Sequence, residues 1–131
     1  MIGLDTNVLV RYLAQDDALQ SARARRIFEC HLTEECPGFI SLVTMVETVW
    51  VLDRAYGLSG AQIAQTIERI LQADTLVVQN EQEVFTAMIA LKTGSARFAD
   101  ALIGALGEWA GCSATLTFDR KAARPSTFQL A

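Results

Sequence analysis

Four carboxylate side chains of this 131-residue chain stand in otherwise apolar segments, where a charge without a partner is costly to bury. Asp5 follows the apolar start MIGL, and Glu47 lies within VTMVETVWVL. Asp100 lies within RFADALIGAL, and Asp119 follows ATLTF. The other glutamates all fall in plainly polar or amphipathic segments. Carboxylates that crowd together repel one another, and a divalent cation removes that conflict.

Oxygen ligands without nearby cysteine or histidine favour magnesium or manganese. Such ions activate a water, and a pair of them stabilises the attacking and leaving oxygens of a phosphodiester. This chemistry requires neither a histidine base nor a protein nucleophile, and the chain offers no good candidate for either. Its only histidine, His31, lies in a charged helical stretch where a surface position is expected.

Polar residues near the four acids could orient water or contact phosphate groups. The small ones are Thr6, Asn7 and Thr117. The basic ones, which could equally be ordinary surface charge, are Arg11, Arg97, Arg120, Lys121 and Arg124.

Each acid also has a simpler interpretation. An acid after a strand often caps a helix or stands in a turn, and an acid in the first turn of a helix complements the helix dipole. Glu47 could belong to a solvated stripe shared with Thr44 and Thr48. The coincidence of four such acids nevertheless favours one common site.

Apolar runs alternate with amphipathic segments along the chain. The runs predict strands at Met1–Leu4, Phe39–Ile40, Thr75–Val78, Ala114–Phe118 and Phe128–Leu130. The segments between them predict helices at Asn7–Leu13, Asp17–Glu34, Ser41–Tyr56, Ala61–Gln72, Glu81–Lys92 and Arg97–Ala110. This alternation implies a mainly parallel sheet, with ligands bound at the carboxyl ends of the strands. Asp5 and Asp119 are therefore expected at one sheet edge.

Composition predicts one globular domain over residues 1–131, because the chain is 51% hydrophobic and 20% charged. No apolar stretch is long enough for a membrane span, and the first residues do not resemble a secretory signal, so we expect a cytoplasmic location. The formal charge of −4 argues against a passive nucleic-acid coat. It does not argue against an enzyme that holds phosphates through metal ions.

The three cysteines do not predict a disulfide framework, because their number is odd and no export signal precedes them. Cys30, His31 and Cys36 lie close together, but no second pair of ligands completes a tetrahedral zinc site.

The segments IGLDTNVLVRYL, SLVTMVETVWVL, FADALIGAL and TLTFDRKAA, in this order and spacing, resemble the PIN domain, with VapC-type toxins of bacterial toxin–antitoxin pairs as the nearest likeness. The resemblance covers essentially the whole chain. It implies a three-layer α/β/α sandwich with a mainly parallel sheet, and a magnesium- or manganese-dependent endoribonuclease. Asp5, Glu47, Asp100 and Asp119 match the four acids of the family, and Thr6, Asn7 and Thr117 match small polar positions beside them.

The resemblance also implies partners. These are an RNA substrate, a second copy in a homodimer and, for the toxins, a cognate VapB-like antitoxin that binds DNA with one end and blocks the acidic pocket with the other. One position departs from many relatives: Lys121 stands where they carry a further acid. We therefore expect one tightly held ion at Asp5 and Asp100, with a second arriving only with RNA.

Three other functions compete with the toxin. A PIN nuclease in RNA processing or decay would share the same site. A phosphate-receiving signalling domain also gathers acids at strand ends, but requires an aspartate near mid-chain, where this chain has the helical Glu47. A binding module without catalysis would not require all four acids.

Overall fold

The computed structural model describes residues 1–121 and 127–131, which form two compact units. Unit 1 comprises Met1–Leu58 and Arg69–Gln79, and unit 2 comprises Ser59–Glu68 and Asn80–Ala131. Each unit is therefore built from two separate stretches of the chain, and the helix Gly60–Gln72 (α4) contributes residues to both. None of the described helices is long and apolar enough to cross a membrane.

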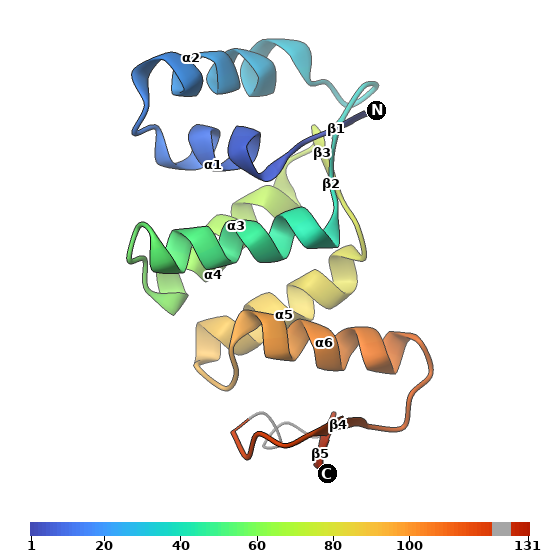
Figure 1. Cartoon of the computed structure of the whole chain (residues 1–131). Coiled ribbons are helices and arrows are strands. Elements are labelled where there is room, and N and C mark those ends of the chain that lie inside the picture. Colours follow the sequence, from blue (N-terminus) through green and yellow to red (C-terminus); the bar gives the residue numbers. More distant parts are fainter. Residues whose placement is uncertain (122–126) are drawn as a thin grey trace. The chain divides into compact units, whose positions relative to one another are not determined.

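Unit 1 contains a three-stranded parallel sheet in the order β1-β2-β3 (Figure 1). Its strands are β1 (Ile2–Gly3), β2 (Gly38–Ile40) and β3 (Leu76–Val78). Its helices, besides the end of α4, are α1 (Thr6–Ala14), α2 (Ala18–Arg26), the π-helical turn η1 (Ile27–His31) and α3 (Leu42–Arg54).

Small and aliphatic residues set the spacing of this sheet. Gly3 pairs with Phe39, and the Leu4 amide donates to the Phe39 carbonyl at 2.9 Å. Gly38 leaves room for Leu4, because a Cβ at position 38 would lie 2.7 Å from Leu4 Cδ1. Burial of aliphatic side chains of this kind stabilises a fold by about 1.5–3 kcal/mol each. The buried hydrophobic residues of unit 1 are Leu4, Leu9, Val10, Ala24, Phe28, Leu32, Ile40, Met45, Leu52, Ile70 and Val78.

Two sequence-based predictions in unit 1 are wrong. The helix expected over Asp17–Glu34 ends earlier, since its last turn widens into η1 and Leu32 adopts extended backbone. Thr33 then bonds Cys36 through both its hydroxyl and its main chain, and this local turn replaces further helix. The apolar run Met1–Leu4 predicts a buried strand, yet Ile2 is 53% exposed, because β1 stands at the end of the strand order.

Unit 2 pairs two helices with a small parallel sheet. Its elements, besides the start of α4, are α5 (Glu81–Thr93), α6 (Phe98–Trp109), β4 (Thr115–Thr117) and β5 (Phe128–Leu130). β4 and β5 pair in parallel, with Thr115 opposite Phe128. In the part of the chain that the structure describes, these strands form their own sheet and do not extend β1–β3. Gly94, at φ 74°, closes α5 with a left-handed cap.

Two glycines of α6 allow this helix to approach β4 and β5 closely. A Cβ at Gly104 would lie 2.6 Å from Thr127 Oγ1 and 2.7 Å from Phe128 Cε2. A Cβ at Gly107 would lie 2.7 Å from Thr115 Oγ1. The glycines thus mark the face of α6 that covers the sheet of unit 2.

We predict that Gly104→Leu lowers the free energy of unfolding by about 1–3 kcal/mol, because the new side chain cannot fit between α6 and the sheet. Ala99→Leu, at an exposed position of the same helix, is the matched control and should change stability by less than about 0.5 kcal/mol. Urea denaturation of both variants measures the difference. Equal stability of the two variants would contradict the close packing of α6 on β4 and β5.

Candidate functional site

Asp5 occupies the position between β1 and α1. Its backbone is extended (φ −79°, ψ 157°), and its main-chain carbonyl accepts hydrogen bonds from the amides of Val8 and Leu9. Its side chain makes no capping hydrogen bond and is exposed. The simple interpretation of Asp5 as a helix cap therefore does not explain why a carboxylate stands here.

The start of α3 is anchored to the end of β1. Ser41 caps α3 by accepting a hydrogen bond from the Thr44 amide at 3.2 Å. The Thr44 hydroxyl donates to the Leu4 carbonyl at 3.4 Å, directly before Asp5 in the sequence. These bonds, together with the parallel pairing of β1 and β2, place the beginnings of α1 and α3 at the same edge of the sheet.

Glu47 lies in the second turn of α3 and contacts the first residue of α1. Thr6 Oγ1 donates to Glu47 Oε1 at 2.7 Å, across 41 positions of sequence. Thr6 is 8% exposed, whereas Glu47 is exposed, so a nearly buried hydroxyl holds an accessible carboxylate. The solvated stripe considered from the sequence is wrong, since Thr44 and Thr48 are buried. The hydrogen bond occupies Oε1 of Glu47, and the other oxygen accepts no hydrogen bond from the described residues.

Asp119 lies in a tight turn after β4. Its amide donates to Thr117 Oγ1 at 3.0 Å, and its Oδ1 accepts from the Lys121 amide at 2.8 Å. These bonds end the strand at Thr117 rather than at Phe118, whose side chain is 90% exposed. The hydrogen bonds of this turn therefore explain the role of one Asp119 carboxylate oxygen. The Thr117 hydroxyl stabilises the same turn by accepting from the Asp119 amide.

Asp100 lies in the first turn of α6 and is half-buried. It shares the helix face of Gly104 and Gly107, at spacings of four and seven residues, and this face covers β4 and β5. From Gly107 to Asp100 the helix runs back about 10 Å.

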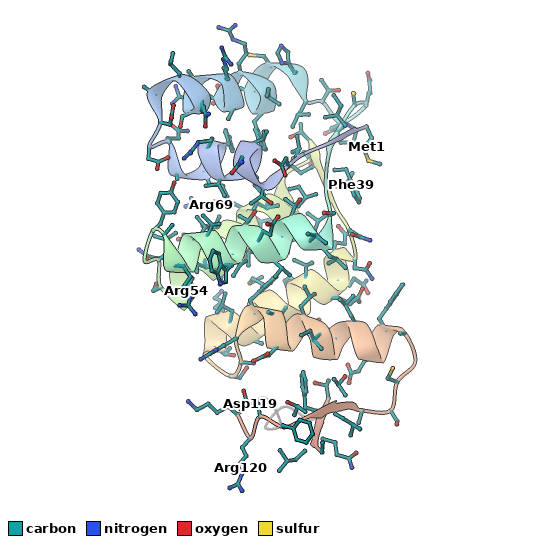
Figure 2. All side chains as sticks on the ribbon, viewed as in Figure 1. Met1, Phe39, Arg54, Arg69, Asp119 and Arg120 are labelled. Atoms are coloured by element: carbon teal, nitrogen blue, oxygen red, sulfur yellow. The ribbon has the colours of Figure 1, made fainter. Side chains whose placement is uncertain are left out.

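Figure 1 shows β4 running in the direction opposite to α6. Gly107 neighbours Thr115 at the start of β4, and Asp119 follows in the turn after this strand ends at Thr117. Asp100 and Asp119 therefore lie toward the same end of the α6–β4 pair, and Figure 2 shows Asp119 beyond the end of β4.

Each unit thus supplies two of the four predicted acids, with small polar residues beside them. Asp5 and Glu47 belong to unit 1, and Asp100 and Asp119 belong to unit 2. Within residues 1–121 and 127–131, no group of three or more histidine, cysteine, aspartate or glutamate side chains that could hold a metal ion is present. β1 and β4 belong to different sheets among the described residues, because β4 pairs with β5 there and not with β1–β3, so the expectation that Asp5 and Asp119 share one sheet edge is wrong.

The donor atoms themselves suit a hard divalent cation. All four side chains offer carboxylate oxygens, which magnesium and manganese prefer. None of them is neutralised by a basic side chain, because Arg11–Asp16 is the only ion pair among the described residues. Of the basic residues considered from the sequence, Arg97, Arg120 and Lys121 are exposed, and Arg124 lies outside the described residues.

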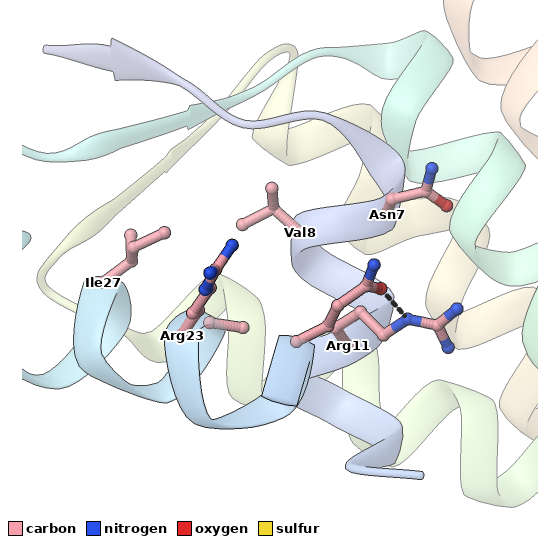
Figure 3. A pocket seen from close by; sticks show the side chains of 7 residues that line it. Asn7, Val8, Arg11, Arg23 and Ile27 are labelled. Atoms are coloured by element: carbon pink, nitrogen blue, oxygen red, sulfur yellow. Dashed lines mark hydrogen bonds between the residues drawn. The ribbon is translucent and has the colours of Figure 1, made fainter. Parts of the chain in front are cut away.

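A pocket of about 400 Å³ opens between α1 and α2 (Figure 3). Its lining residues are Asn7, Val8, Arg11, Gln20, Arg23, Ala24 and Ile27. Asn7 and Arg11 were considered from the sequence, whereas Gln20 and Arg23 were missed. Gln20, Arg23 and Ala24 share one face of α2, and Ile27 of η1 continues their spacing, but the spacing alone does not show that α1 faces this side.

A hydrogen-bond network fixes Arg11 at this pocket. Arg11 Nε donates to Gln20 Oε1 at 2.7 Å, and Arg11 Nη1 donates to Asp16 Oδ1 at 3.1 Å. The Tyr56 hydroxyl donates to Asp16 Oδ2 at 2.7 Å, which links the loop after α1 to the residues after α3. This bond from Tyr56, more than the charge of Arg11, holds the pKa of Asp16 below its ordinary value. The same bond raises the pKa of Tyr56.

We predict that Tyr56→Phe raises the pKa of Asp16 toward its ordinary value. A carboxyl group whose pKa is lowered by folding stabilises the fold at pH values above its ordinary pKa. This stabilisation disappears as the pH falls through the lowered pKa. NMR titration of the side-chain carboxyl carbon of Asp16 measures the change. Tyr12→Phe is the control, because the Tyr12 ring stacks on Phe28 and should leave the Asp16 titration unchanged. An unaltered Asp16 titration in Tyr56→Phe would contradict the network.

Comparison with known proteins gives one family. The model of the PIN domain matches residues 2–126. No curated protein and no solved structure matches the chain. The family match and the parallel pairing of all described strands confirm the predicted fold class, an α/β protein with a mainly parallel sheet, and are consistent with an α/β/α sandwich.

Proposed function

The chain belongs to the PIN domain family, and from this membership we propose that it is a magnesium- or manganese-dependent endoribonuclease. PIN domains are generally nucleases, they act on RNA, and they generally use divalent metals. The observation that carries the proposal is the hydrogen bond from Thr6 to Glu47 beside Asp5. It holds the Glu47 carboxylate against Thr6, the residue that follows Asp5, and the Asp5 side chain makes no capping hydrogen bond.

In this proposal Asp5, Glu47, Asp100 and Asp119 hold the metal and are the catalytic residues. When bound, a divalent cation supplies Lewis-acid activation of a water and neutralises charge on the phosphate. Thr6 orients Glu47 through its hydrogen bond, and Thr117 orients Asp119 through the turn. The family match spans both units, and this supports the proposal that the four acids act as one set. For the same reason we propose that residues 1–131 form a single PIN domain.

Three further residues contact the substrate in this proposal. Asn7, in the first turn of α1, is two residues from Asp5 and can donate to a phosphate oxygen or a base. Arg97 precedes α6 and Arg120 follows Asp119, and both are exposed. Each guanidinium group can donate two parallel hydrogen bonds to two oxygens of one phosphate.

The biological role that we propose is that of a VapC-type toxin. It would act in the cytoplasm as a homodimer and be inhibited by a VapB-like antitoxin. The resemblance of the four acidic segments supports this role, and RNA processing or decay is the alternative for the same chemistry. Growth arrest on expression of the protein, absent with Asp5→Ala and relieved by a small DNA-binding protein encoded beside it, would distinguish the toxin from a processing enzyme.

We predict that Asp100→Asn lowers RNA cleavage at least about 100-fold, because the substitution removes a charged metal ligand without changing its size. The measurement is incubation of total RNA with manganese, followed by mapping of the cleaved ends. Asp74→Asn, at an exposed aspartate outside the proposed site, is the matched control. Absence of cleavage by the unaltered protein, or equal cleavage by Asp100→Asn, would show that the proposed function is wrong.

We predict that Thr6→Val lowers RNA cleavage about 10- to 100-fold, which is the effect of losing a hydrogen bond to a charged group. Thr6→Ser keeps the hydroxyl and should retain most of the activity. Urea denaturation serves as a control that both variants remain folded. If Thr6→Val cleaves as well as the unaltered protein, the hydrogen bond to Glu47 has no part in catalysis.

A further inference from the structure

The pocket between α1 and α2 contains polar groups that the proposed metal site does not use. Its volume of about 400 Å³ lies within the range of sites that bind small molecules. Three aliphatic side chains form an apolar wall, and two amides and two guanidinium groups also line the pocket (Figure 3). All of its lining residues belong to unit 1. Such a combination suits a ligand with a flat apolar part and a negatively charged part.

The charge of the pocket is positive. Asp16 balances Arg11, but Arg23 is exposed and forms no ion pair with any described residue. Arginine is suited to such a ligand, because its planar group binds two phosphate oxygens at once and also stacks on an aromatic ring. A phosphate group together with a nucleobase has both of these features.

The pocket is prepared for binding before a ligand arrives. Gln20 and Asp16 hold Arg11 from two sides, and Tyr56 holds Asp16, so ordering this guanidinium on binding costs little. Gln20 uses its carbonyl oxygen for Arg11, which leaves its NH₂ group to donate to an acceptor on a base.

The pocket also begins beside the proposed metal site. Asn7 lines it and lies two residues after Asp5, about 3 Å further along the axis of α1. A chain with one phosphate at Asp5 would therefore bring its neighbouring nucleotide to Asn7.

We propose that this pocket binds one nucleotide of the RNA substrate, adjacent to the phosphodiester that is cleaved. The base lies against the apolar wall, the amides of Asn7 and Gln20 contact its edge, and Arg23 binds its phosphate with help from Arg11. This inference rests on the proposed ribonuclease function, and it names the part of the protein that binds the substrate beside the metal.

The test is binding of a fluorescein-labelled single-stranded RNA of mixed sequence, measured by fluorescence anisotropy in EDTA over a range of salt concentrations. Arg23→Ala should weaken binding about tenfold and reduce the dependence of log K on log salt by about 0.7–1, the value for one lost phosphate contact. Arg26→Ala is the matched control, an exposed arginine of the same helix that does not line the pocket. It should leave both quantities nearly unchanged.

Equal losses in Arg23→Ala and Arg26→Ala would indicate general attraction to a basic surface and would overturn the proposal, as would no loss in either. A loss of binding to an acidic peptide in Arg23→Ala, with RNA binding intact, would assign the pocket to a protein partner instead. The assay contains no metal and measures no cleavage. Failure of the nuclease proposal would therefore appear as absent cleavage by the unaltered protein, whereas failure of this inference would appear only in the comparison of the two variants.

Discussion

The parallel pairing of β1 with β2 is the constraint on which unit 1 depends. Hydrogen bonds to the carbonyls of Pro37 and Phe39 fix the register of two very short strands. Because both strands run in the same direction, Asp5 and the helix α3 follow at one edge. A slip of one residue would reverse every side chain of β1 and break the contact of Thr44 with Leu4. The Thr6–Glu47 hydrogen bond exists only in this register.

Much of the element order could be predicted from the sequence, because helical and strand periodicities differ and most helices end at strong signals. Ser41 and Gly94 are such signals: α3 begins directly after Ser41, and α5 ends directly before Gly94. The helix predicted over Asp17–Glu34 is wrong at its end, because residues 27–31 form the π-helical turn η1 and the Thr33–Cys36 contact replaces helix after His31. A hydrogen bond from a side chain to the backbone does not change the hydrophobic periodicity of the sequence, so the end of this helix could not be predicted from it.

The candidate site was predictable in part for a similar reason. An acid in an apolar segment is visible in the sequence, and this identified Asp5 and Glu47. Their link through Thr6 joins residues 41 positions apart and depends on the register of the sheet, which composition does not encode. Arg23 was missed because the segment ALQSARARR is polar on most sides. Only the position of α1 determines which side of α2 becomes the wall of a pocket.

The distribution of charge joins the two proposals. The protein is acidic overall, and its proposed ligand is an anion, so attraction cannot come from net charge. Attraction has to arise locally, from cations bound at unpaired carboxylates and from arginines that acids do not neutralise. Lys92 and Lys121 are the only lysines among the 11 basic residues, so nearly all of the positive charge is carried by planar guanidinium groups. A ribonuclease with this charge distribution would bind RNA weakly without metal. The pocket between α1 and α2 would then select the nucleotide that lies next to the cleaved bond.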